Sequence, residues 1–178
     1  MSKKYSVVFF IVSFIIVVAS SGIKKSDERA KAEHIWNYNV QSIQQLITDS
    51  PLIILGEVNE KKMSIRDNKI KYTASQVKVK EILKGNILPQ DNYINIMQQN
   101  NKQDPVVKAG EEVILFLYPY GGTQVKEGYA CVGLGQGYYR IKENRAEPAI
   151  PGSPSLNIDI EGQRAIVNYI KLQGAQLR

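Results

Sequence analysis

The sequence predicts a mainly β (α+β) fold, a small antiparallel β-barrel of about five to six strands with a helix at each end of the domain. Two observations support this prediction. Short apolar runs recur along the chain, and Gly, Pro and Asn residues separate them at intervals of roughly ten to fifteen residues. The runs do not alternate with helical patterns, so a parallel α/β fold is not expected.

The N-terminal segment Tyr5–Ile23 is uncharged and largely apolar, and it lies between Lys3–Lys4 and Lys24–Lys25. A basic start, an apolar run and then small residues such as Ala19 are typical of an export signal. The run is also long enough to cross a bilayer as one helix. Three arrangements stay open: a cleaved signal peptide, an uncleaved anchor with the domain outside, and an anchor with the domain inside. No cysteine stands directly after the run, so a lipid-anchored lipoprotein is not expected.

The chain divides into a signal peptide or N-terminal membrane anchor at residues 1–23, a polar spacer at 24–39 and a single domain at 40–175. Its formal net charge of +6 is modest, because acidic residues are interleaved with the basic ones. Such a charge suits an anionic cell wall or membrane surface, although it also fits plain solubility. Cys131 is the only cysteine, so no disulfide can form within the chain. The hydrophobic core alone must therefore stabilise the fold.

The domain begins with a helical pattern at Val40–Thr48. This helix is expected to end before Pro51, because the residue preceding a proline avoids the α region. The apolar run Leu52–Val58 predicts a buried strand. Residues 61–68 are polar and predict a hairpin or loop.

Lys69–Leu83 predicts a strand whose apolar positions change phase. The apolar residues hold even positions up to Ala74 and odd positions from Val77 onward. Because a strand alternates faces at each residue, we expect a β-bulge or sharp coil at Ser75–Gln76 that returns both sets to one core. The alternative is a regular strand whose outer face is covered by one of the two helices.

The second half of the domain contains further short strands and then a helix. Glu111–Tyr118 gives the strongest strand signal, and we expect the barrel interior and a helix to cover its two faces. Residues 143–154 predict a loop, and Ile158–Leu172 closes the domain with a roughly helical spacing. Weaker strand patterns lie at Tyr93–Met97, Tyr129–Val132 and Gly137–Ile141.

Four segments carry a family resemblance through their order and spacing: Asp49–Val58, Val77–Gly85, Ala109–Leu117 and Gly135–Ile141. Together they resemble exported bacterial domains related to tissue inhibitors of metalloproteinases and to the netrin module. The resemblance implies an oligonucleotide/oligosaccharide-binding (OB) barrel, so an OB-like β-barrel is expected over residues 40–175. The eukaryotic inhibitors of this group bind a protease metal through a free N-terminal cysteine. This chain has no cysteine before Cys131, so we do not expect it to bind a protease metal in that way.

No motif for catalysis or metal binding stands out. His34 is the only histidine and lies in the polar spacer, so no Ser-His-Asp or Cys-His arrangement is expected. Asn157–Gly162 partly matches the start of a calcium loop, but Asn168 stands where that loop needs a bidentate glutamate. Gly133–Gly137 is glycine-rich, yet a strand pattern follows it where a phosphate site needs a helix. We therefore expect neither a metal nor another cofactor.

Tyrosines and lysines are the candidate ligand-binding residues. Aromatic side chains of OB-type barrels stack on bases or sugars, although tyrosine also packs well inside strands. Lysines that share a strand face can form a basic stripe with Lys71 or Lys84, although a solvated face gives the same pattern. The candidates are Tyr118, Tyr120, Tyr138, Tyr139, Lys78 and Lys80.

The expected function is that of an exported, non-enzymatic binding or interaction module. Its expected partner is a protein or envelope polymer at the cell surface, together with the membrane if residues 5–23 are uncleaved. No nucleic acid partner is expected. Two alternatives stay open: a protease inhibitor that acts through a loop or edge without a metal-binding cysteine, and an enzyme with an unconventional site.

Overall fold

The computed structural model describes residues 39–67, 69–86, 92–121, 125, 128–156 and 163–176. The apolar N-terminal segment, the spacer up to residue 38 with His34, and residues 157–162 lie outside these ranges. Within the described ranges, no helix is long and apolar enough to cross a membrane.

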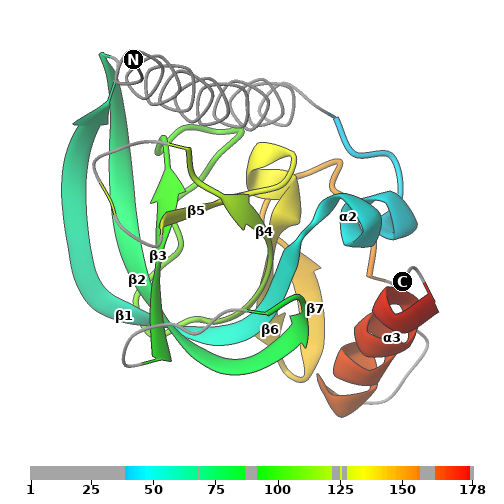
Figure 1. Ribbon diagram of the computed structural model, residues 1–178. Coiled ribbons are helices and arrows are strands. Elements are labelled where there is room, and N and C mark those ends of the chain that lie inside the picture. Colours follow the sequence, from blue (N-terminus) through cyan, green and yellow to red (C-terminus); the bar gives the residue numbers. More distant parts are fainter. Residues whose placement is uncertain are drawn as a thin grey trace, which may run out of the picture.

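Seven strands form one sheet that closes on itself, which confirms the predicted mainly β, barrel-like fold (Figure 1). The strands are β1 (Leu52–Asp67), β2 (Ile70–Lys84), β3 (Tyr93–Gln98), β4 (Glu112–Pro119), β5 (Gly128–Cys131), β6 (Tyr138–Lys142) and β7 (Arg145–Pro148). The sheet order is β1-β2-β3-β5-β4-β6-β7, and a further pairing between β1 and β4 closes a ring of five strands. Only the pairing of β3 with β5 is parallel among those described.

Two α-helices lie together on one side of the ring (Figure 1). They are α2 (Ile43–Asp49) and α3 (Gln163–Gln176), and both agree with the predicted flanking helices apart from their bounds. Ser42 caps α2, because its Oγ accepts the Gln45 N–H at 3.1 Å. At the other end of α2, Lys84 Nζ donates to the carbonyls of Ile47 and Thr48. A cation here satisfies carbonyls that the helix leaves unpaired.

The long strand β1 pairs with two neighbouring strands. Its first part pairs with both β2 and β4, and its second part continues with β2 as a curved hairpin, on the left of Figure 1. Gly56 allows the close approach of β2 in the first part. A Cβ at Gly56 would lie 2.6 Å from Val77 Cγ1 and 2.9 Å from the Lys78 carbonyl oxygen.

The sheet divides the core into two main parts. The interior core lies within the ring and contains Ile54, Val77, Ile94, Ile96, Leu115 and Leu117. The outer core lies between the sheet and the helices and contains Leu46, Ile47, Ile53, Phe116, Val167 and Ile170. Leu115 and Phe116 are fully buried in different cores. The expectation that both faces of this strand are covered is therefore confirmed.

The β-bulge expected at Ser75–Gln76 is wrong in its placement. β2 pairs regularly with β3 across this region, with Ala74 opposite Met97 and Val77 opposite Ile94. The extra residues lie in β1, whose residues 59–61 face Gln76 alone. The two apolar sets of β2 therefore face opposite sides. The outer set is not covered by a helix. Its residues Tyr72 and Ala74 pack with Ile65 and Met97 in a third cluster. Tyr120 and Val125 pack against this cluster.

The segment predicted as a hairpin or loop is part of the β1–β2 hairpin, and one predicted loop contains a strand. Residues 61–67 continue β1, because their pairing with β2 satisfies the backbone although their side chains are mostly polar. The loop predicted at 143–154 begins with β7, which pairs with β6. A four-residue strand of the sequence Arg-Ala-Glu-Pro has no apolar alternation, so the sequence pattern gave no sign of it.

Candidate functional site

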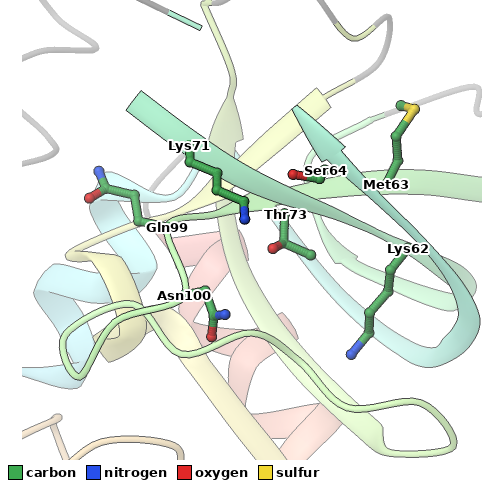
Figure 2. Close-up of a pocket in the computed structure, with 7 residues that line it drawn as sticks. All are labelled: Lys62, Met63, Ser64, Lys71, Thr73, Gln99 and Asn100. Carbon is green, nitrogen blue, oxygen red and sulfur yellow. The ribbon is translucent and has the colours of Figure 1, made fainter. Parts of the chain in front are cut away.

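An open hollow of about 370 Å³ lies between the β1–β2 hairpin and the segment after β3 (Figure 2). Figure 2 shows side chains from both hairpin strands around it. No carboxylate is among the described residues that line the hollow. These residues are Lys62, Met63, Ser64, Lys71, Thr73, Gln99 and Asn100.

Strand register places most of these groups on one face of the hairpin. The opposite pairs are Lys62 with Ser75, Ser64 with Thr73, and Arg66 with Lys71. Residues that are directly opposite share a face, and successive pairs two residues apart return to it. We call this surface the cationic face, and it consists of Lys62, Ser64, Arg66, Lys71, Thr73 and Ser75.

The cationic face continues the inner surface of the ring. Ser75 pairs with Ile96 of the interior core, so Thr73 and Lys71 extend the same face of β2 outward. The Ser75 side chain is fully buried, and its Oγ has no hydrogen-bond partner among the described residues. Ser75 is not among the residues that line the hollow, so it marks the buried inner end of the cationic face.

The charges of the cationic face repel one another. Arg66 and Lys71 lie directly opposite each other, an arrangement that destabilises a sheet. Within the described ranges, neither these two residues nor Lys62 forms an ion pair. Asp67 is the neighbouring acid, but it lies on the other face and accepts the Tyr120 hydroxyl at 2.7 Å. The face is therefore suited to an anionic group supplied from outside.

Two buried polar side chains hold the segment that completes the hollow. Gln98 is fully buried; its Nε2 donates to the Pro105 carbonyl at 2.6 Å, and its Oε1 accepts the Val107 N–H at 3.0 Å. Asp104 is 2% exposed, and its Oδ2 accepts the Gln99 N–H at 2.7 Å. These bonds fix the backbone on which Gln99 and Asn100 reach the hollow. The backbone that carries these two side chains is thus held in place by the protein itself.

Burial raises the pKa of Asp104 to about 6, and the Gln99 N–H opposes this shift only in part. Because the pKa of Asp104 in the folded protein is above the usual value of 3.8, protonation of Asp104 stabilises the folded state relative to the unfolded state. This stabilisation is fully present below about pH 4 and is lost as the pH rises through about 6. We therefore expect Asp104→Asn to gain about 3 kcal/mol relative to wild type between pH 4 and pH 7.

Urea unfolding of both proteins at pH 4, 5, 6 and 7 measures this difference. The asparagine side chain of the variant keeps an oxygen that can accept the Gln99 N–H, so loss of that hydrogen bond does not contribute to the difference in stability. A stability difference that is the same at pH 4 and pH 7 would show that Asp104 titrates normally.

Three of the candidate tyrosines are core residues. Tyr118 and Tyr139 are buried in the outer core and Tyr138 in the interior core. The Tyr138 hydroxyl donates to Glu111 and the Tyr139 hydroxyl to the Pro154 carbonyl, while burial raises the pKa of both phenols. Their rings are covered by protein, so stacking on a ligand, which we expected for them, is not possible here.

Tyr120 and the two candidate lysines are more accessible, but they lie apart from the hollow. Tyr120 is half-buried, and its ring meets Tyr72 edge to face at 5.6 Å. Lys80 forms ion pairs with Glu57 at 2.9 Å and Glu112 at 3.1 Å. Lys78 is exposed on the face of β2 opposite to Lys71. A basic stripe that joins Lys78 to Lys71 is therefore wrong, because alternation sends the two side chains to opposite faces.

Lys62, Met63 and Ser64 were missed because residues 61–68 were interpreted as a polar hairpin or loop, whereas Lys71 and Thr73 lie in the strand predicted over Lys69–Leu83. Lys62, Ser64 and Arg66 alternate with Met63 and Ile65 in the sequence. This period of two was the available signal, and it indicates a strand with one polar face.

Cys131 and the glycine-rich segment have structural roles. Cys131 is buried, and burial raises the pKa of its thiol well above the usual value, which disfavours the reactive thiolate. Gly133–Gly137 contains the short 3₁₀-helix η2 (Leu134–Gly137) between β5 and β6. The described residues contain no group of three or more His, Cys, Asp or Glu side chains that could hold a metal ion.

No protein-family model matches this chain, and no curated protein matches its sequence. The functional argument therefore depends on the residues and geometry of the hollow.

Proposed function

We propose that this protein is an exported, non-enzymatic module that binds an anionic ligand at the cell surface through the hollow and the cationic face. The export part of this proposal is supported by the sequence pattern of Lys3–Lys4 followed by Tyr5–Ile23. The ligand is an anionic group of a protein or of an envelope polymer.

The observation that carries the proposal is the Arg66–Lys71 pair. Two like charges directly opposite each other lower the stability of the hairpin, and no described acid offsets them. Lys80, Lys142 and Lys171 have acidic partners, while other described lysines, such as Lys78, form no ion pair but have no like charge directly opposite in the described pairing. An unfavourable charge arrangement beside a polar hollow is expected where an anionic ligand binds.

The chemistry of the hollow supports binding. Lys62 and Lys71 supply ammonium donors, Ser64 and Thr73 supply hydroxyls, and the segment after β3 supplies amides.

Binding of the full-length protein to dextran sulfate, with uncharged dextran as the reference polymer, tests the proposal. Lys62→Gln, Arg66→Gln and Lys71→Gln should each weaken binding by about three- to tenfold, because each removes one charged donor. Lys78→Gln is the matched control, since it removes one exposed charge from the other face of the same hairpin. It should change binding less than about twofold.

Stability provides an independent readout for the same variants. Arg66→Gln removes the like-charge pair, so it should stabilise the protein by about 0.2–1 kcal/mol while it weakens binding. Equal losses of binding in all four variants would indicate attraction by net charge alone. Unchanged binding in the three variants of the cationic face would refute the proposed site.

A further inference from the structure

We infer that the ligand is a linear polyanion without aromatic bases, which lies lengthwise along the β1–β2 hairpin and places about three successive anionic groups on the cationic face. This inference rests on the proposed function and specifies the ligand of the same site. It concerns the arrangement of donors along the hairpin, whereas the proposed function requires only that the site attracts an anion.

The donors form three steps along the hairpin. Arg66 and Lys71 form the first step, the hydroxyls of Ser64 and Thr73 the second, and Lys62, which lies opposite the buried Ser75, the third. Same-face steps in a strand are about 6–7 Å apart, so the outer steps are separated by about 13 Å.

This spacing matches a repeating anionic chain. A phosphodiester chain or a charged polysaccharide that repeats its anionic groups at about the length of one step can place one group at each step. A compact anion can occupy only one step and leaves the other donors unused. In the chain-like ligand, the middle group receives hydrogen bonds from the two hydroxyls, and the outer groups meet the cations.

The described residues offer no aromatic platform beside these donors. Binding of single-stranded nucleic acid by OB-type barrels relies on aromatic side chains that stack on successive bases. Here the nearest aromatic residue of the hairpin, Tyr72, lies on its other face and is buried in the third cluster. No aromatic side chain lines the hollow among the described residues. The anionic groups are therefore recognised without bases.

Abasic deoxyribose-phosphate oligomers of increasing length test the inference, because they carry phosphates at a constant spacing and no bases. The affinity of the full-length protein should rise at least about thirtyfold from one phosphate to three, and less than about threefold from four phosphates to eight. The logarithm of the affinity for the four-phosphate oligomer should fall with the logarithm of salt concentration with a slope of about −2. Lys71→Gln should reduce that slope by about 0.7, while Lys78→Gln should leave it unchanged.

Oligo(dT) with the same numbers of phosphates is the comparison ligand. Equal affinity for the abasic and thymine oligomers supports the inference. A preference of more than about tenfold for oligo(dT) would show that bases are bound, and would overturn it. Affinity that does not depend on length would also overturn it. In that case, loss of dextran sulfate binding in Lys71→Gln would still support an anion site, so the two proposals can fail separately.

Discussion

Replacing Phe116 with alanine should lower the free energy of unfolding by about 3–5 kcal/mol. Phe116 is fully buried in the outer core, and its ring meets Tyr139 edge to face with centroids 5.5 Å apart. The substitution removes the buried apolar surface of the ring and leaves a cavity between the sheet and the helices. Because both helices pack on this core, their attachment to the sheet should weaken as well.

Leu115→Ala is the companion variant, since Leu115 is fully buried on the opposite face of β4, in the interior core. It should cost about 2–5 kcal/mol. Leu172→Ala is the matched control, because Leu172 is 63% exposed and its replacement should change stability by less than about 0.5 kcal/mol. Urea unfolding followed by circular dichroism measures all three. Midpoints of Phe116→Ala and Leu115→Ala equal to that of Leu172→Ala would remove β4 from the core.

The fold could be predicted because its strands carry continuous apolar runs. β4 has six consecutive buried residues from Val113 to Tyr118, which a strand needs when a ring interior and a helix layer cover its two faces. Such a run can be recognised in the sequence without knowledge of the strands that pair with it. The turn at Lys84–Asn86 was equally clear, because glycine is favoured where φ is positive, and Gly85 has a φ of 88°.

The candidate site could not be predicted because it depends on pairing. The register of the hairpin decides that Lys71 lies opposite Arg66, and the absence of an extra residue in β2 decides that Lys71 and Lys78 lie on opposite faces. A change of one residue in register would send Lys71 to the other face. The phase change in β2 suggested a bulge in that strand, but the burial of both faces made a bulge there unnecessary. Local sequence carries no information about what covers the outer face.

Replacing Gly85 with alanine should lower the free energy of unfolding by about 2–5 kcal/mol, although it adds a single methyl group. Gly85 has a φ of 88°, which an L-residue adopts only at a cost of about 1–2 kcal/mol. An added Cβ would also lie 2.3 Å from the Pro51 carbonyl oxygen and 3.3 Å from Leu52 Cα. Both are backbone atoms at the start of β1, so relief requires the two strands to separate. That movement would also draw Lys84 away from the end of α2.

Gly110→Ala separates backbone strain from the clash. Gly110 has a φ of 79°, close to that of Gly85, but its added Cβ would meet no heavy atom of the described residues within 4 Å. It should therefore cost only the conformational term, about 1–2 kcal/mol. Urea unfolding of the two variants gives the contribution of the close approach as the difference between them. Equal destabilisation would show that β1 and the turn after β2 move apart freely, and that the approach of Pro51 to Gly85 contributes little to closing the ring.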